Sequence, residues 1–339
     1  MRFLVIGLGS MGKRRVRNLI ALGYKDNVIG FDPREDRCLE GKEYGIEVFN
    51  DFNKAIVEYN PNVFLISTPP NLHMKYAYFA YEYNISCFIE ASVVDSEKIL
   101  ELSKMIKDKN IIMAPSCTMR FYPAPIKIKE LINNGVIGEV LNYNYHTGQY
   151  LPDWHPWESI EDFYVSNPDT GGAREIVPFE LTWINDIFGD SKPLACVRRK
   201  LTDMSANIDD IYHCLLEYPD NVIGNLTVEV ISRPKAVRDF RVIGSGGEIV
   251  FSGDTNSLKY INTSMEDWES ISFDIGTVED GYINPEEPYI NEVKAFVDGV
   301  KSIGNNSSTY PNTLEDDYKI LQTLYRLEEI SEGRDDLSR

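Results

Sequence analysis

Residues 3–12 read FLVIGLGSMG, and this stretch decides the fold of the first part of the chain. Its four leading apolar residues predict a buried β-strand, and Gly7, Gly9 and Gly12 fit the pattern G-x-G-x-x-G. Gly7 permits a tight turn, Gly9 lets the backbone approach a pyrophosphate, and Gly12 lets the following helix pack against the strand. The stretch therefore predicts a strand–turn–helix unit that binds a dinucleotide.

The residues around this turn predict the rest of such a site. The helix that begins at Ser10 and Met11 would present backbone N–H groups and the positive end of its dipole to the phosphates. Asp32 lies 20 residues beyond Gly12, where its carboxylate would accept both ribose hydroxyls. This carboxylate favours NAD over NADP, although Arg34 could pair with a 2′-phosphate. The alternative is a strand–turn–helix whose glycines serve packing only.

The charged residues are unevenly distributed. The 339 residues include 34 Lys and Arg against 53 Asp and Glu, which gives a net charge of −19. Such an excess of negative charge disfavours binding to nucleic acid or to an anionic membrane surface. Residues 13–17 are nevertheless basic. We interpret them as a solvated face of the first helix, with local attraction of an anionic cofactor as the alternative.

Two different patterns divide the chain near residue 118. Before it, short runs that are apolar throughout alternate with helical patterns, which predicts a parallel sheet covered on both faces. These predicted strands are 3–6, 28–31, 63–66, 85–89 and 111–113. After it, polar and apolar residues alternate with a period of two, which is typical of antiparallel strands with one packed face. These strands are predicted at 139–149, 194–202, 211–218, 222–231, 237–243 and 248–251.

The fold class that follows is α/β. We expect an N-terminal Rossmann dinucleotide-binding domain at residues 1–118 and a C-terminal α+β domain at residues 119–339. The second domain would contain a large, mostly antiparallel, open-faced sheet and would end in two helices, at about 286–302 and 313–331. Thr313 followed by Asp316 resembles a helix-capping arrangement.

The remaining composition bears on location and metals. The five cysteines lie far apart without a C-x-x-C pair, which favours reduced thiols in a cytoplasm over a disulfide framework or a zinc site. No apolar run approaches the ~20 residues of a membrane span, and the first apolar run is too short for a signal peptide. No His, Asp or Glu grouping has metal-ligand spacing. We expect a cytoplasmic protein with no membrane partner and no metal.

Further motifs extend over nearly the whole chain. They are STPPNLH at 67–73, Glu90 at a strand end, MRFYP at 119–123, INNGVIGE at 132–139 and GGA at 171–173. With the glycine turn and Asp32, these motifs resemble those of the glucose–fructose oxidoreductase / inositol dehydrogenase (Gfo/Idh/MocA) family. The resemblance implies NAD(P)-dependent oxidation or reduction of sugars, cyclitols or related compounds, and a homodimer or homotetramer formed through the C-terminal sheet. It also implies that the nicotinamide side of the cofactor is bounded by Thr68, Pro69, Asn71, His73 and Glu90.

Three positions depart from the family pattern. Members commonly carry Glu-Lys-Pro where this chain has Glu90-Ala91-Ser92. In register with the family's aspartate and histidine on the helix after the glycine block, this chain has Ile176 and Phe179. Hydride transfer from an alcohol needs a group that takes the hydroxyl proton, so either another residue supplies it or the reaction has changed or been lost. The biliverdin-reductase branch also lacks the lysine, so redox activity stays open.

Two segments offer replacements for the proton-transfer group. Asp153, Trp154 and His155 combine a carboxylate, an aromatic ring and an imidazole that can titrate near neutral pH, which suits contact with a sugar ring. The alternative is a packed aromatic loop with a hydrogen-bonded histidine. Glu175, at the start of the helix after the glycine block, could act as a base if desolvated. We predict His155 and Glu175 as catalytic, and Asp153 and Trp154 as substrate-binding.

Two arginines are further substrate-binding candidates. Arg174 could clamp a carboxylate or phosphate bidentately, with a structural Arg–Glu pair as the alternative. Arg120 could contact the substrate, with an ion pair that links the domains as the alternative. The leading hypothesis is an NAD-dependent dehydrogenase acting on a sugar, sugar nucleotide or cyclitol. Two hypotheses stay open beside it: a non-catalytic NAD-binding sensor or scaffold, and a lyase or epimerase that uses NAD transiently.

Overall fold

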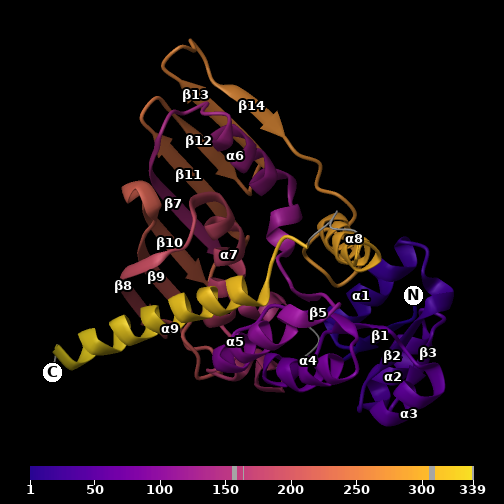
Figure 1. Cartoon of the computed structure of the whole chain (residues 1–339). Helices are drawn as coiled ribbons and strands as arrows, with labels where there is room; N and C mark the ends of the chain where they lie inside the picture. The colour runs from indigo at the N-terminus through magenta and orange to yellow at the C-terminus, as the bar shows by residue number, and fades with distance from the viewer. Residues whose placement is uncertain (155–158, 163, 305–309, 338–339) are drawn as a thin grey trace. The chain divides into compact units, whose positions relative to one another are not determined.

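The structure is a computed structural model that describes residues 1–154, 159–162, 164–304 and 310–337. Its contacts divide the chain into two units (Figure 1), the first made of residues 1–118 and 284–318 and the second of residues 119–283 and 319–339. The sequence prediction assigned all of 119–339 to the second domain. Residues 284–318 instead belong to the first unit, because α8 (Glu287–Lys301) packs against α1 (Ser10–Ala21).

The first unit contains a parallel sheet with the strand order β3-β2-β1-β4-β5-β6. This is the order of a doubly wound dinucleotide-binding fold, as the sequence predicted. Its strands are β1 (Phe3–Ile6), β2 (Val28–Phe31), β3 (Glu47–Phe49), β4 (Val63–Ile66), β5 (Ser86–Ile89) and β6 (Met113–Pro115). Every residue of β1, β2, β4 and β5 is buried, which explains why these runs, apart from Ser86, carry no polar side chain.

Helices connect these strands and complete the first unit. Besides α1 and α8 they are α2 (Glu35–Lys42), α3 (Phe52–Tyr59), α4 (His73–Glu82) and α5 (Ser96–Met105). The register pairs Phe3 of β1 with Val28 of β2 on one side and with Val63 of β4 on the other. The carboxyl ends of β1, β2 and β4 therefore lie together along one edge of the sheet, where Gly7, Asp32 and Ser67 follow.

The second unit contains a mostly antiparallel sheet with the order β14-β13-β12-β11-β7-β10-β9-β8, in which only β7 and β10 pair in parallel among the described residues. This confirms the predicted fold class. The strands are β7 (Val140–Gly148), β8 (Lys192–Arg199), β9 (Ile211–Glu217), β10 (Ile223–Glu229), β11 (Val237–Gly244), β12 (Gly247–Ser252), β13 (Ser257–Asn262) and β14 (Glu269–Ser272).

The alternation along β7 separates a covered face of this sheet from an uncovered one. Tyr143 and Tyr145 are buried and pack on α7 (Ala173–Phe188), with ring centroids 5.0 Å from Phe188 and 5.4 Å from Trp183. Asn144 lies on the opposite face. The other helices of this unit are α6 (Pro123–Asn133) and α9 (Leu314–Leu337), whose first residues belong to the first unit.

The sequence patterns did not single out three strands. β3 is three residues long and half exposed, and β13 and β14 form a hairpin at the sheet edge with polar residues on both faces. Short or edge strands carry little apolar periodicity because little of their surface is buried. None of the three strands contributes a residue to the predicted sites.

Candidate functional site

The glycine turn after β1 has the close packing that its spacing predicted. Gly7 has a φ of 88°, and a Cβ at Gly12 would lie 1.8 Å from the carbonyl oxygen of Gly7. A Cβ at Gly9 would instead meet no backbone; its nearest neighbour would be the end of the Arg37 side chain, with Nη1 at 2.8 Å. Gly7 and Gly12 are therefore required by the turn itself, whereas Gly9 leaves room beside a guanidinium for an anionic group.

The start of α1 and Asp32 complete the features expected of a dinucleotide site. Gly9 is the N-cap of α1, so no side chain of the described residues caps this helix. Asp32 is buried at the end of β2; its Oδ2 accepts the Leu8 N–H at 2.8 Å and its Oδ1 accepts the Arg34 N–H at 2.9 Å. Each carboxylate oxygen keeps a further lone pair. The residues present thus fit a dinucleotide whose phosphates meet the turn and whose ribose meets Asp32.

Arg34, the residue expected to soften the preference for NAD, is held by a neighbour. Its Nε and Nη2 donate to the two carboxylate oxygens of Asp36, at 3.1 and 2.6 Å. This hydrogen bonding lowers the pKa of Asp36 to about 2. Both side chains are exposed, so the pair is a surface ion pair that occupies the fork of Arg34 with an internal carboxylate.

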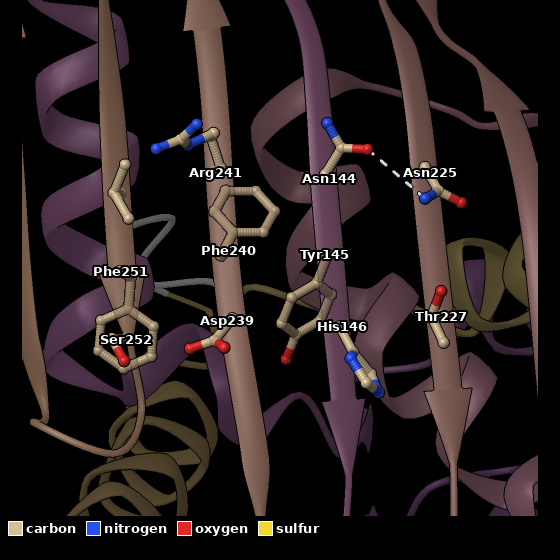
Figure 2. A pocket seen from close by; sticks show the side chains of 11 residues that line it. Asn144, Tyr145, His146, Asn225, Thr227, Asp239, Phe240, Arg241, Phe251 and Ser252 are labelled. Carbon is tan, nitrogen blue, oxygen red and sulfur yellow. Dashed lines mark hydrogen bonds between the residues drawn. The ribbon is translucent and has the colours of Figure 1, made fainter.

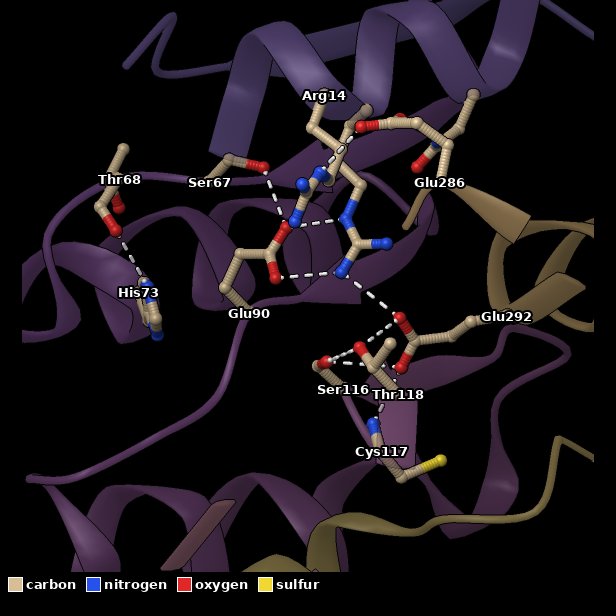
Figure 3. A network of polar contacts seen from close by, with 12 residues as sticks. Arg14, Ser67, Thr68, His73, Glu90, Ser116, Cys117, Thr118, Glu286 and Glu292 are labelled. Carbon is tan, nitrogen blue, oxygen red and sulfur yellow. Dashed lines mark hydrogen bonds and ion pairs between the residues drawn. The ribbon is translucent and has the colours of Figure 1, made fainter. Parts of the chain in front are cut away.

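The loop after β4 is closed by His73. The Nε2 of this buried residue lies 2.8 Å from the carbonyl oxygen of Thr68, and since a carbonyl only accepts, Nε2 donates (Figure 3). Burial lowers the pKa of His73, so the ring is neutral. Its Nδ1 and the Thr68 hydroxyl are buried without a hydrogen-bond partner among the described residues. Pro69 and Asn71 are exposed at the tip of this loop.

Glu90, predicted to bound the nicotinamide side, lies in a buried ion-pair network (Figure 3). Arg15 Nε and Nη2 donate to its two carboxylate oxygens at 2.6 and 2.8 Å, and the Ser67 hydroxyl donates to Oε1 at 3.1 Å. Arg15 also pairs with Glu292 of α8, at 3.0 Å between Nη2 and Oε2. Its guanidinium carbon lies 4.4 Å from the ring centroid of Phe88. The Glu90 carboxylate is therefore engaged from within the first unit.

The basic segment at the start of α1 is not a solvated face. Arg14 and Arg15 are 2% and 0% exposed, so that interpretation is wrong for both. Arg14 Nε donates to Glu286 at 2.9 Å, and Arg17 Nη2 reaches the same carboxylate at 2.9 Å. The cause is the return of the chain after residue 283, which brings Glu286 and Glu292 onto α1; no local pattern in residues 13–17 signals this.

Glu175 lies in the first turn of α7 and has the features of a proton acceptor. Its Oε1 accepts the Tyr164 hydroxyl at 2.6 Å. Its Oε2 is buried and has no hydrogen-bond partner in the described part of the chain. Burial raises the pKa of Glu175 to about 7, which the Tyr164 hydrogen bond partly opposes. A carboxyl that titrates near neutral pH and keeps one free oxygen can take or give a proton at that oxygen.

The two arginine candidates of the second unit are both bonded to helices. Arg174 Nε donates to Glu328 of α9 at 2.7 Å, and its Nη1 donates to the carbonyl of Asp169. Arg120 Nε donates to the Thr182 carbonyl at 2.9 Å and Nη1 lies 3.5 Å from Asp186 Oδ1, both on α7. Arg174 thus has a structural Arg–Glu pair, with Glu328 as the glutamate, and Arg120 is tied to α7 within its own unit.

The aromatic loop after β7 is described only in part. Asp153 is exposed at the end of a short 3₁₀ helix (Leu151–Asp153). Trp154 is half-buried, and its indole Nε1 is buried with no partner among the described residues. His155 lies outside the described residues. The structure therefore neither joins this histidine to Glu175 nor separates them.

The departures from the family pattern leave α7 with two glutamates of different kinds. Ile176 and Phe179 are half-buried. Glu180 is fully buried, and its Oε2 accepts the Tyr145 hydroxyl at 2.8 Å and the Trp183 Nε1 at 2.7 Å. Arg238 Nη2 lies 2.9 Å from its Oε1. Glu180 is compensated by a cation, whereas Glu175 accepts its hydrogen bond from a neutral phenol.

Sequence reasoning missed Tyr164 and Arg37. Tyr164 belongs to a short 3₁₀ helix (Tyr164–Ser166) eleven residues before Glu175, and no spacing rule joins a loop tyrosine to a helix carboxylate. Arg37 follows Arg34 by one helical turn of α2, and its approach to Gly9 depends on how α2 packs beside the turn. The sequence of α2 alone does not tell which of the two arginines faces the glycine turn, because that depends on the orientation of the helix.

The uncovered face of the large sheet carries a shallow hollow of about 420 Å³, which both polar and apolar residues line (Figure 2). Asn144, His146, Asp239 and Arg241 lie along it on β7 and β11. Across the ranges that the structure describes, no three His, Cys, Asp or Glu side chains gather as a metal site would require. None of the described helices has the length and apolar content needed to cross a membrane.

Comparison with curated proteins finds enzymes that act on sugars. The chain is 25% identical over 252 residues to D-xylose 1-dehydrogenase (NADP(+)) of Hypocrea jecorina, a match that covers 68% of this chain and 62% of that enzyme. It is 30% identical over 106 residues to levoglucosan dehydrogenase of Pseudarthrobacter phenanthrenivorans, which covers 31% of this chain and 26% of that enzyme. The chain thus matches less than two thirds of the length of these relatives.

Comparison with solved structures shows the same fold over almost the entire chain. A levoglucosan dehydrogenase in complex with NADH and levoglucosan superposes with a TM-score of 0.82 at 18% identity, over 98% of this chain and 97% of that one. An inositol dehydrogenase homologue from Azotobacter vinelandii, complexed with NAD⁺, gives 0.80 at 14% identity, over 98% and 95%.

Family comparison agrees with both parts of the fold. Residues 1–115 match the family described as "Oxidoreductase family, NAD-binding Rossmann fold". Residues 126–250 match the "GFO/IDH/MocA C-terminal domain". The glycine turn, Asp32 and the strand order of the first sheet lie within the first match, and α7 and the core of the second sheet lie within the other. The chain belongs to the Gfo/Idh/MocA family of oxidoreductases.

Proposed function

We propose that this protein is an NAD-dependent dehydrogenase that oxidises a hydroxyl group of a sugar, sugar nucleotide or cyclitol, or reduces the corresponding carbonyl. The observation that carries the proposal is Glu175, a half-buried residue on the helix that follows the glycine block, whose Oε2 is buried without a hydrogen-bond partner among the described residues and whose pKa is raised to about 7. The family to which the chain belongs and the glycine turn of the first unit support NAD as the redox partner of this carboxyl.

The proposed cofactor is NAD rather than NADP. When bound, the dinucleotide accepts or donates the hydride. Gly7, Gly9 and Gly12 would cradle its phosphates and Asp32 would accept its ribose hydroxyls, with Thr68, Pro69, Asn71 and His73 on the nicotinamide side. Arg34 pairs with Asp36 at the surface, so a 2′-phosphate would have to displace this carboxylate and would also meet the negative charge of Asp32. Arg37, beside Gly9, would contact an anionic part of the cofactor.

The proposed proton transfer uses Glu175 and Tyr164. Glu175 Oε2 would accept the hydroxyl proton of the substrate as its carbon–hydrogen bond breaks. The Tyr164 hydroxyl, bonded to Oε1, would fix the carboxylate and stabilise its charged form. Such general base catalysis contributes about 10²–10⁴-fold to a rate. The arrangement supplies the proton acceptor that Ala91, Ile176 and Phe179 do not.

The proposed substrate class rests on the relatives and on the loop after β7. Dehydrogenases of xylose and of levoglucosan are among the relatives, and both compounds are sugars or sugar anhydrides with several hydroxyl groups. Asp153, Trp154 and His155 have side chains that hydrogen-bond to hydroxyls or stack on a sugar ring. Arg120 and Arg174 would shape the site by holding α7 and α9, since their donors are bonded there.

The proposal extends to assembly and location. The uncovered face of the large sheet would join two or four copies, because a sheet face with exposed Leu215 and Ile243 gains by burial against a second copy. We place the protein in a cytoplasm, where its five cysteines, free in the structure, would stay reduced.

Turnover with a panel of sugars, sugar nucleotides and cyclitols tests the proposal, with reduction of NAD followed by the absorbance of NADH. We expect turnover with at least one polyhydroxylated compound. Gly9→Ala is the matched control: its new Cβ meets only the flexible end of Arg37, so the fold should survive while dinucleotide binding is lost. NAD binding without turnover on any compound would instead support the sensor hypothesis, which the apolar Ile176 and Phe179 favour.

A further inference from the structure

Cys196 and Cys214 are two buried thiols of the second unit that the proposed reaction does not use. They lie directly opposite each other on the antiparallel strands β8 and β9, and both are 1% exposed. Their sulfur atoms lie 4.0 Å apart. The thiol of Cys38, by contrast, donates to the carbonyl oxygen of Asp32 at 3.1 Å. Cys196 and Cys214 are thus the two thiols that the described residues bring together.

The backbone around this pair is compatible with a disulfide bond. Residues directly opposite each other on antiparallel strands have Cα atoms about 4.5 or 5.5 Å apart, and the Cα atoms of disulfide-linked cysteines are about 4.4–6.8 Å apart. The register between β8 and β9 shifts before Ala195 and is regular at Cys196. A sulfur–sulfur bond of about 2.0 Å therefore requires rotation of the two side chains, and the strands keep their pairing.

The position of β8 gives a small oxidant access to the pair. β8 is the last strand in the order of the second sheet and has a strand neighbour on one side only. Near Cys196, the side chains of Leu194 and Val197 are 40% and 36% exposed, so little apolar surface holds this strand. Such elements open locally at a lower free energy than the whole protein. Cys196, on the outer of the two strands, is therefore the first of the pair to meet the solvent.

The two sulfur atoms have different chemical roles. The hydrogen bond with Cys196, together with burial, raises the pKa of Cys214 well above its ordinary value. Cys214 therefore keeps its proton and donates it toward Cys196. Because the thiolate is the nucleophile in cysteine chemistry, the first attack on an oxidant comes from Cys196. Cys214 is then the second thiol that resolves the oxidised sulfur.

We propose that a hydroperoxide converts Cys196 and Cys214 into a reversible disulfide. The Cys196 sulfur attacks one peroxide oxygen, the oxygen–oxygen bond breaks, and the leaving hydroxide takes the proton that Cys196 lost. Cys196 is then a sulfenic acid. The Cys214 sulfur attacks it, the sulfur–oxygen bond breaks, and hydroxide leaves as water with the Cys214 proton. The two thiols lose two electrons, which reduce hydrogen peroxide to two water molecules. A thiol reductant such as glutathione restores both thiols.

The disulfide would close a segment that supports the start of α7. Between the two cysteines, the Asp209 carbonyl accepts the Ala173 N–H at 3.2 Å, and Arg198 Nη1 pairs with the Asp209 carboxylate at 2.5 Å. A covalent link between β8 and β9 opposes local opening of this segment. Oxidation should therefore slow hydrogen exchange at the Ala173 amide.

Peptide mass mapping of the full chain tests the proposal. The folded protein is treated with hydrogen peroxide, and the remaining thiols are alkylated in denaturant. We expect one pair of linked peptides, which contain Cys196 and Cys214 and have lost two hydrogen atoms, and we expect dithiothreitol to separate them. Hydrogen exchange measured on the same sample should be slower in the peptide that contains Ala173. Alkylation of both Cys196 and Cys214 after the peroxide treatment would overturn the proposal, as would a disulfide that joins either of them to another cysteine.

Single variants separate the roles of the two sulfur atoms. Cys214→Ala should accumulate a sulfenic acid at Cys196 that a cyclic diketone reagent traps, and Cys196→Ala should give severalfold less trapping at Cys214. Cys87→Ala is the matched control, since it removes another buried strand thiol and should leave the linked peptides unchanged. Equal trapping in the first two variants would contradict the assigned order of attack. The wild-type mapping decides the disulfide itself, whether or not a variant folds.

Discussion

The buried carboxylates of the Arg15 network and the Glu175 carboxyl at the start of α7 have opposite electrostatic surroundings. In the first unit, Glu90 and Glu292 share Arg15, and Glu292 also accepts the Cys117 N–H at 2.6 Å and the Thr118 hydroxyl at 2.7 Å. In the second unit, the hydrogen bond to Glu175 comes from Tyr164, which is neutral. The first arrangement stabilises charged carboxylates; the second leaves one carboxyl easy to protonate.

This contrast separates structural from chemical roles without reference to conservation. A buried charge that is paired and hydrogen-bonded holds structural elements together. A buried carboxyl without a cation is destabilised in its charged form, which costs stability but sets its pKa close to the pH at which a general base works. Glu180, five residues along α7, is paired with Arg238 and belongs to the first kind.

Replacement of Glu175 has the largest expected effect. We expect Glu175→Gln to lower kcat by about 10²–10⁴-fold, because the amide cannot accept the hydroxyl proton. Steady-state kinetics on a substrate found in the panel would measure this, with NAD binding checked separately. Glu139→Gln, at an exposed position, is the control and should keep wild-type turnover. Wild-type turnover in Glu175→Gln would show that another residue, with His155 the first candidate, takes the proton.

Removal of Arg15, the cation that Glu90 and Glu292 share, should lower the stability of the protein. Arg15→Leu leaves Glu90 and Glu292 buried without a positive partner, and we expect the free energy of unfolding to fall by about 3–5 kcal/mol. Denaturant titration would measure it. Adding Glu90→Gln and Glu292→Gln to Arg15→Leu removes both charges and should restore part of the loss. If the triple variant were no more stable than Arg15→Leu, unpaired charge would not be the cause.

The same contrast explains what the sequence could and could not predict. The buried strands, the glycine turn and the Thr313–Asp316 cap depend on residues close in sequence, and the structure has all of them. The pairing of Arg15 with Glu292 depends on a return of the chain after 277 residues, so residues 13–17 looked like an ordinary basic helix face. Glu175 could be named as a base from its place on the helix, whereas Tyr164 could not. Local patterns identify elements; long-range contacts decide which charges are compensated.

The pH dependence of the free energy of unfolding should reveal the raised pKa of Glu175 independently of turnover. The folded-state pKa of Glu175 is raised to about 7, above its ordinary value of 4.5, so the folded protein holds this proton where the unfolded chain has lost it. Wild-type stability therefore falls, through this group, as the pH rises from about 4.5 past 7. Glu175→Gln avoids that loss and should exceed the wild type by about 1–3 kcal/mol above this range. Thermal unfolding across pH would show it; parallel curves for the two proteins would contradict it.

Replacement of Tyr164, which donates a hydrogen bond to Glu175, has the smallest expected effect. Its hydroxyl stabilises the charged form of Glu175, so Tyr164→Phe should raise the pKa of that carboxyl further. A single hydrogen bond contributes about 0.5–1.5 kcal/mol, so we expect kcat to fall by about tenfold or less and the midpoint of its pH profile to move up by about one pH unit or less. The direction of the shift is decisive, because loss of packing alone would lower kcat without moving the midpoint. A profile that kept its midpoint would mean that Tyr164 fixes the loop and does not act on Glu175.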